Sequence, residues 1–588
     1  MRSALLACLL VATTIARGQT VTPAPPWLAR SNVDAQILLE AYTRFFPEHA
    51  GELGVQGVDS RVLDLDFARS ERIQAAFNAS ATDLEALRER EKDTRVRQDL
   101  DILIEDARLQ AAIEAANHRY LLPVLDVAEQ VYTGVRVLLA DQVDPARYRA
   151  AATRLQRYAG LEEGYTPLAG LAEARVREQL GTLGLLFPSR SELEQQLANS
   201  DLYLDGVAEL LDQYKVDGAG KALKELRVQI GAWNDFLRRD VLPKAREDYR
   251  LPPELYAVRL REIGVDRPPA ELAQRARTAF IEIRNQMVAL APLVARELQL
   301  DTGDYRDVIR QLRMRQITGD ATLPLYRERL ATIEDIIRRE KIVTLPEREA
   351  IIRLATAAES ASVPSPQMQP PPFINNQGER GEFVLPLTAP PVEGETATSR
   401  LEDFTFDAAT WTLIAHEARP GHELQFASMV ENGVSLARGV FAFNSVNVEG
   451  WALYAEAEMQ PYLPLDGQLI ALQFRLWRAA RAFLDPGLQS GDISLDEARR
   501  ILTDEVVLTE ANARQELQRY TFRSPGQATS YFYGYQHLLD LRARTEIALG
   551  KAFDRQRFHD FVLAQGLLPP ALLDKAVQDG FIPAAEKP

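Results

Sequence analysis

The sequence predicts a mainly α-helical protein, a two-lobed helical bundle around a deep cleft, with a small edge β-strand or hairpin near the functional site. Three observations predict this class. The chain has 588 residues, well beyond the ~250–300 at which one hydrophobic core usually stops growing. Apolar residues from about position 31 to 360 recur at helical spacing, and one clear strand pattern follows a proline-rich segment.

Residues 1–18 have the pattern of a secretory signal peptide. Arg2 precedes a largely apolar run from Ala4 to Ile15, and small residues lead into a polar start. The run is too short to span a bilayer. We therefore expect an exported protein, periplasmic or extracellular, without stable membrane insertion after signal cleavage. Anchoring as a lipoprotein through Cys8 is the weaker alternative.

Cysteine usage and charge exclude several classes of function. Cys8 is the only cysteine, so the mature chain would have no disulfide scaffold, no cysteine nucleophile and no cysteine-ligated zinc. The 68 basic and 84 acidic residues give a net charge of −16, and neither sign is gathered into a long run. We therefore expect no nucleic-acid partner.

Residues 19–360 are expected to form a helical N-terminal lobe. Positions 100, 103, 104, 107 and 111 are all apolar, which is the spacing of one buried helical stripe. Turn signals separate the helices, and the segment has no internal repeat of fixed period.

Residues 361–400 are expected to form a proline-rich linker and an edge strand. Five prolines between positions 364 and 372 remove the backbone donors that a helix needs. Glu382–Leu385 is the clearest strand pattern in the chain, and Pro386 limits it to a sheet edge. Such an edge could bind an extended peptide, or the segment could be a short hairpin that closes a loop.

Residues 401–588 are expected to form a helical catalytic lobe, and this lobe contains a pair of neighbouring histidines. They are His416 and His422 in the segment HEARPGH. Zinc helices usually carry their histidines four residues apart, on one face. Six residues would place these two about 120° apart on an unbroken helix. Pro420 and Gly421 supply a break that could return His422 to the side of His416.

A third ligand is expected from another helix. Glu449 and Glu456 share one helical face but lie two turns apart, so only one could touch the metal. We favour Glu449, which stands 27 residues after His422, room for a loop and a return. Glu423 is a rival ligand, better placed to orient one, and the glutamates at 449 and 456 could instead be solvated.

Four segments resemble the bacterial domain-of-unknown-function family 885 (DUF 885) in order and spacing, over most of the mature chain. They are HEARPGHELQ at His416–Gln425, EGWALYAE at Glu449–Glu456, PGQATSYFYGYQHLLDLR at Pro525–Arg542 and FDRQRFHDFVLAQGLLPPALL at Phe553–Leu573. This family is similar to helical zinc peptidases of the gluzincin type, such as the angiotensin-converting enzyme and carboxypeptidase Taq groups. The chain departs from those peptidases by two extra residues between the histidines.

The resemblance implies a zinc metallopeptidase with one Zn²⁺ per chain and a peptide substrate. His416, His422 and Glu449 would be the metal ligands, and Glu417 the general base. A donor for the oxyanion is expected near Tyr531 and Tyr535, which lie one helical turn apart.

Two further expectations concern the same C-terminal region. His537 fits a structural role as well as a catalytic one, and Arg542 or Arg523 could receive a substrate carboxylate. Two rival functions fit the same residues: a non-catalytic helical protein that binds peptides, and a metal-dependent hydrolase of non-peptide amides or esters. The sequence gives no indication of oligomeric state.

Overall fold

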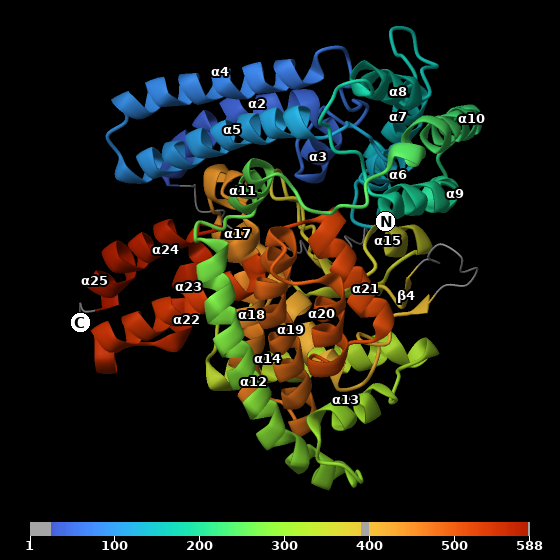
Figure 1. Ribbon diagram of the computed structural model, residues 1–588. Coiled ribbons are helices and arrows are strands. Elements are labelled where there is room, and N and C mark those ends of the chain that lie inside the picture. Colours follow the sequence, from blue (N-terminus) through green and yellow to red (C-terminus); the bar gives the residue numbers. More distant parts are fainter. Residues whose placement is uncertain (1–24, 390–398, 586–588) are drawn as a thin grey trace, which may run out of the picture.

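The computed structural model describes residues 25–389 and 399–585. The fold is mainly α-helical with a few short strands, as the sequence predicts. Figure 1 shows the helices labelled α2 to α10 (residues 36–236) above those of the second half of the chain, whereas α12 (Pro269–Leu298) lies beside the latter. The predicted signal peptide, residues 1–18, lies outside the described residues. In the described part of the chain, every helix is too short or too polar to cross a bilayer.

The first five helices pack against one another through a buried apolar stripe. In α5, the predicted stripe at positions 100, 103, 104, 107 and 111 is buried throughout, and α4 packs along it. The side chain of Asp93 caps the start of α5 by accepting a hydrogen bond from the N–H of Arg95. The bounds are α1 (Pro26–Asp34), α2 (Gln36–Phe45), α3 (Pro47–Glu52), α4 (Arg69–Arg90) and α5 (Thr94–Tyr120).

The next five helices surround a hydrophobic core of their own, which includes Tyr132, Tyr203 and Trp233. They are α6 (Val127–Arg136), α7 (Tyr148–Tyr158), α8 (Leu168–Gln179), α9 (Arg190–Gln213) and α10 (Gly220–Phe236). A second and larger core joins α2, α4 and α5 to the segment 276–343 and to the C-terminal third. Residues of the predicted N-terminal lobe therefore contribute to both cores.

The following helices lead from the middle of the chain to a small sheet. They are α11 (Pro253–Glu262), α12 (Pro269–Leu298), α13 (Tyr305–Arg313) and α14 (Thr322–Glu340). The sheet contains β1 (Ile351–Leu354), β2 (Gln367–Gln369) and β3 (Glu382–Leu385), and α15 (Ala357–Ser362) connects the first two strands. A separate pair consists of β4 (Thr388–Ala389) and β5 (Ser399–Arg400).

The predicted edge strand is the central strand of this sheet. β3 pairs with β1 in parallel and with β2 in antiparallel. Pro386 follows the last residue of β3, so the missing N–H lies outside the strand and limits neither side. The proline-rich segment itself supplies β2, and the edges of the sheet are β1 and β2.

A cleft of ≈ 310 Å³ opens between this sheet and α6 and α9. Arg353, on its wall, forms ion pairs with Glu359 and Glu382. None of the predicted metal ligands lines this cleft.

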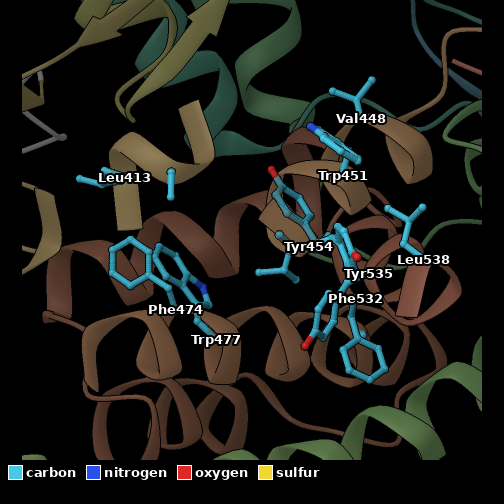
Figure 2. Close-up of a cluster of buried hydrophobic side chains, with 14 of the residues drawn as sticks. Leu413, Val448, Trp451, Tyr454, Phe474, Trp477, Phe532, Tyr535 and Leu538 are labelled. Atoms are coloured by element: carbon cyan, nitrogen blue, oxygen red, sulfur yellow. The ribbon is translucent and has the colours of Figure 1, made fainter. Parts of the chain in front are cut away.

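The C-terminal helices surround α19, which is buried from Leu469 to Gln489 and packs against α12 and α22. Figure 2 shows aromatic side chains of α18, α19 and α22 filling the space between these helices. The bounds are α16 (Ala409–Leu413), α17 (His422–Asn432), α18 (Ser445–Met459), α19 (Leu465–Ser490), α20 (Leu495–Arg500), α21 (Glu510–Gln518), α22 (Thr529–Leu549), α23 (Arg555–Ala564), α24 (Pro570–Ala576) and α25 (Ile582–Ala585).

Helices α18 and α22 touch through their backbones at two glycines. A Cβ on Gly534 would overlap the carbonyl oxygen of Val446, and a Cβ on Gly450 would overlap the Cα of Gly534. Larger residues at either position would force the two helices apart. This contact sets the position of Glu449 relative to the tyrosines of α22.

Replacing Gly534 by alanine is expected to lower the free energy of unfolding by about 1–3 kcal/mol, because the added methyl group overpacks the contact. Gly231 is a matched control, since a Cβ there meets nothing within 4 Å in the interior of α10. Gly231→Ala should stabilise the protein by about 0.5–1 kcal/mol. Urea unfolding of both variants measures the difference, and equal effects would contradict the tight contact.

Candidate metal centre

The helix that carries the first histidine breaks where the sequence predicts a break. α16 continues into a π-helical turn, η5 (Ile414–Ala418), which contains His416. Arg419 is then extended, at φ −127° and ψ 135°, and its peptide bond to Pro420 is cis. A new helix, α17, begins at His422. The two histidines therefore lie on either side of the break.

The break is held in place by a glycine and by two neighbouring helices. A Cβ on Gly421 would overlap the carbonyl oxygens of Ala415 and His416, so only glycine fits there. The indole N–H of Trp451, on α18, donates to the carbonyl oxygen of Pro420 at 2.9 Å. On the other side, Arg419 binds Glu334 of α14 at 2.6 Å.

The break brings the two imidazoles together with Glu449. The ring centroids of His416 and His422 are 4.8 Å apart, with the rings at 82°. The Nε2 atom of each histidine lies 3.4 Å from Oε2 of Glu449. Tetrahedral ligands at zinc bond lengths of ~2.0–2.1 Å stand about 3.3 Å from one another. The three predicted ligands are thus within reach of one ion, with all three ligand atoms within 4.8 Å of one another.

Two polar atoms of this cluster are buried without a hydrogen-bond partner, namely Oε2 of Glu449 and Nδ1 of His422. Buried polar atoms without a partner are costly in a folded protein. A metal ion bound by Glu449 and the two imidazoles would supply the partner that Oε2 lacks. The histidines are 4% and 7% exposed, whereas Glu449 is partly exposed, so the imidazoles are screened from bulk water and the carboxylate side of the cluster is less so.

Glu456 orients the first histidine. Its Oε1 lies 2.7 Å from Nδ1 of His416, and its Oε2 accepts a hydrogen bond from the hydroxyl of Thr412 at 2.7 Å. With Nδ1 bound in this way, Nε2 of His416 is the nitrogen that faces Oε2 of Glu449. Carboxylates commonly fix metal-binding histidines in this manner.

Glu423, the rival ligand, binds elsewhere. Its carboxylate accepts a hydrogen bond from Nε of Arg419 at 2.7 Å, and its side chain is fully buried. Glu423 therefore helps to fix the broken segment between the histidines and lies outside the cluster of metal-binding atoms.

The electrostatics of the cluster favour an ionised glutamate between the imidazoles. Burial opposes ionisation of Glu449, but His416 and His422 outweigh it and hold the pKa of that carboxyl well below its usual range. Burial also lowers the pKa of His416, yet Glu449 and Glu456 outweigh this effect and raise its pKa to about 9. Glu417 differs, since burial raises the pKa of its carboxyl and the two imidazoles offset this only in part.

The two predicted tyrosines lie at different places around this cluster. The ring of Tyr531 stacks on that of His416, with centroids 6.4 Å apart at 15°. Its hydroxyl oxygen accepts a hydrogen bond from Nη2 of Arg519 at 3.0 Å, which leaves the hydroxyl proton free to donate. Tyr535 lies one turn further along α22, and its ring faces the guanidinium of Arg475 at 5.5 Å.

The remaining predicted residues bind other side chains. His537 lies 2.8 Å from Asp574 and ties α22 to α24. Arg542 binds Glu546 at 2.8 Å and also Glu458. Arg523 binds the amide of Gln195. None of these three contacts the histidine cluster, so the structure supports a structural role for His537.

Sequence reasoning missed four arginines that face the rings of Tyr531 and Tyr535. They belong to α19 and to the π-helical turn η9 (Arg519–Arg523) that follows α21: Arg475, Arg478, Arg481 and Arg519. No sufficient signal was present in the sequence, because charged residues at three-residue intervals on a helix ordinarily mark its solvent-exposed face.

Comparison with known proteins supports the same fold. A solved structure from Shewanella oneidensis, provisionally described as a lipoprotein of unknown function, is 19% identical, with a TM-score of 0.67 over 94% of this chain and 100% of that one. A second, from Colwellia psychrerythraea and also provisionally described as a lipoprotein, is 18% identical, with a TM-score of 0.74 over 94% and 99%. At this identity the likeness shows the fold alone. No curated protein matches the sequence.

The family comparison agrees with the motifs found in the sequence. The model for bacterial proteins of unknown function DUF885 matches residues 47–577, which is most of the 588 residues. The chain belongs to this family.

Proposed function

We propose that the protein is a zinc-dependent peptidase that hydrolyses peptide bonds in exported oligopeptides. The observation that carries this proposal is the cluster of two buried imidazoles and one carboxylate, whose buried Oε2 atom has no hydrogen-bond partner. His416, His422 and Glu449 would hold one Zn²⁺. The likeness of the motifs to gluzincin peptidases supports the same reaction.

Residues of this chain can supply the proton transfers of peptide hydrolysis. A zinc ion with three protein ligands makes a water molecule more acidic and polarises a carbonyl group. Glu417, beside His416, would take the proton of the attacking water, and its raised pKa suits a general base. It would then pass the proton to the leaving nitrogen. Tyr531, whose ring stacks on that of His416, would donate its hydroxyl proton to the developing oxyanion.

We propose that the protein works outside the cytoplasm, in the periplasm or beyond. Two observations support this location: the signal-like pattern of residues 1–18, and two structural relatives provisionally described as lipoproteins. Fractionation of cells that express the full chain, followed by mass spectrometry of its N-terminus, tests the proposal. An intact N-terminus in the cytoplasmic fraction would contradict it.

The function is tested by zinc analysis together with a peptide library. Purified protein loaded with zinc should contain about one zinc per chain and should cleave peptides, and removal of zinc by a chelator should stop cleavage. Binding of zinc without cleavage of peptides, but with cleavage of simple esters or amides, would favour the non-peptide hydrolase. Binding of peptides without zinc and without cleavage would favour a peptide-binding protein.

Glu456→Gln is expected to weaken zinc binding by about 10- to 100-fold, because a neutral amide orients and polarises His416 less well than a carboxylate does. Glu458→Gln, two residues later on α18, should leave zinc affinity unchanged, since Glu458 binds Arg542. Competition with a fluorescent zinc chelator measures both affinities. Equal affinities in the two variants would show that Glu456 has no effect on the metal.

A further inference from the structure

A stripe of arginines runs along α19 and contacts residues that surround the proposed metal centre. Arg475, Arg478 and Arg481 follow one another at three-residue spacing and are 8%, 6% and 4% exposed. The guanidinium of Arg475 faces the ring of Tyr535 at 5.5 Å, and that of Arg478 lies 6.0 Å from the ring of Tyr531. The stripe therefore faces the tyrosines of α22.

Two of these arginines have carboxylate partners. Arg481 makes two hydrogen bonds to Glu516, both at 2.7 Å. Nη2 of Arg478 lies 3.7 Å from Oε1 of Glu456, the same oxygen that binds His416. Because Glu456 is shared, it only partly compensates the charge of Arg478, whose Nε is buried without a partner.

Arg475 has no such partner. Its Nε and Nη2 are both buried without a hydrogen bond, and among the described residues no carboxylate lies within ion-pair distance. Five other arginines among the described residues also have a buried side-chain nitrogen without a partner. Each of them has an ion pair or a hydrogen bond at another nitrogen of its guanidinium. A buried cation without a counterion is strongly unfavourable, so Arg475 is a place for an anion from outside the chain.

The free atoms also specify the shape of that anion. Nε and Nη2 form the edge of a guanidinium that receives a planar carboxylate through two parallel hydrogen bonds. The ring of Tyr535 faces this guanidinium at 5.5 Å, and its hydroxyl makes no hydrogen bond to the described residues.

The spacing of Tyr531 and Tyr535 gives the scale of the distance between the anion and the bond to be cleaved. Tyr535 is four residues beyond Tyr531, which is about 6 Å along a helix, and Tyr531 stacks on the metal-binding His416. An extended peptide advances about 3.3 Å per residue. A distance of this size corresponds to one or two residues of substrate.

We propose that Arg475, assisted by Arg478 and Tyr535, binds the C-terminal carboxylate of the substrate, and that the enzyme removes one or two residues from that end of a peptide. This inference rests on the proposed peptidase function and assigns its substrate class. Hydrolysis itself follows the scheme above: the amide C–N bond breaks, water supplies the new carboxyl oxygen, and the leaving nitrogen takes the proton.

The test separates binding from cleavage with two versions of one short-peptide library, which end in a free carboxylate or in an amide. Binding is measured by calorimetry on the zinc-loaded Glu417→Gln variant, and cleavage by mass spectrometry on the wild type. The acid library should bind about 10- to 100-fold more tightly than the amide library. The cleaved products should lack one or two C-terminal residues.

Arg475→Met, introduced beside Glu417→Gln, should bring the acid-to-amide ratio close to one without changing the affinity for the amide. Arg475→Lys keeps the charge but loses the two parallel N–H donors of the guanidinium, and should give an intermediate acid-to-amide ratio. Arg277→Met is the matched control, because Arg277 also faces an aromatic ring, that of Phe483, but is exposed on α12. Melting temperature and zinc content confirm that each variant is folded.

The possible failures are distinguishable. Equal binding of acid and amide, or wild-type cleavage mainly at internal bonds, would overturn the assignment of Arg475 while leaving the peptidase intact. Preferential binding of the acid library that depends on Arg475, without cleavage by the zinc-loaded wild type, would uphold the carboxylate site and overturn the peptidase.

Discussion

Glu417→Gln is expected to reduce peptide hydrolysis by roughly 10²- to 10⁴-fold, the range that a positioned general base contributes, while zinc content stays at that of the wild type. Glutamine has nearly the size of glutamate but cannot take a proton from water. Glu417 lies outside the set of His416, His422 and Glu449 that forms the candidate metal site, so its replacement leaves the ligands in place. Rates with a cleaved library peptide and zinc content of the same samples measure both parts.

The matched control for this prediction is Glu282→Gln. Glu282 is exposed on α12, and the same change of charge there should leave both rate and zinc content unaltered. A Glu417→Gln enzyme that hydrolyses peptides at the wild-type rate would exclude Glu417 as the base. A variant that loses its zinc would instead place Glu417 among the ligands.

Much of the fold could be predicted because helical periodicity is a local signal. The buried stripe of α5 and the break at Pro420 both follow from residues adjacent in sequence. The sheet was harder, since β1 lies in a segment expected to be helical and β2 lies within a proline-rich run. Without those partners in view, Glu382–Leu385 could be identified as a strand, but its central place could not.

In the candidate site, too, some features follow from the local sequence and others depend on tertiary packing. The spacing of His416 and His422 and the later Glu449 identified the three atoms that the structure brings together. Glu449 is favoured over Glu456 because 27 residues separate it from His422, room for a loop and a return. Which nitrogen of His416 each glutamate faces requires the packing of α18 against η5. The structure shows that His416 meets both glutamates, one at each nitrogen.

The arginine stripe was missed for a related reason. Arginines at positions 475, 478 and 481 look like the polar face of a surface helix unless the apolar residues between them are seen to be buried as well. Only the packing of α12 and α22 against α19 makes that clear. Burial then converts three ordinary surface charges into a candidate site for a substrate group.

His422→Ala is expected to abolish both zinc binding and hydrolysis, since it removes one of three ligands and the one that joins α17 to the site. Zinc bound at about 1,000 times its dissociation constant stabilises a protein by about 4 kcal/mol. The wild type should therefore melt at a clearly higher temperature with zinc than after chelation, and His422→Ala should melt at the same temperature in both conditions.

His537→Ala makes the same substitution at a histidine that binds Asp574 and lies outside the cluster of metal-binding atoms. It should keep the zinc-dependent rise in melting temperature, even if losing the contact to α24 lowers the melting temperature overall. The two histidine variants thus separate loss of a ligand from loss of a packing contact. Zinc-dependent stabilisation that survives in His422→Ala would mean that the ion binds elsewhere, and the catalytic role of Glu417 would lose its basis.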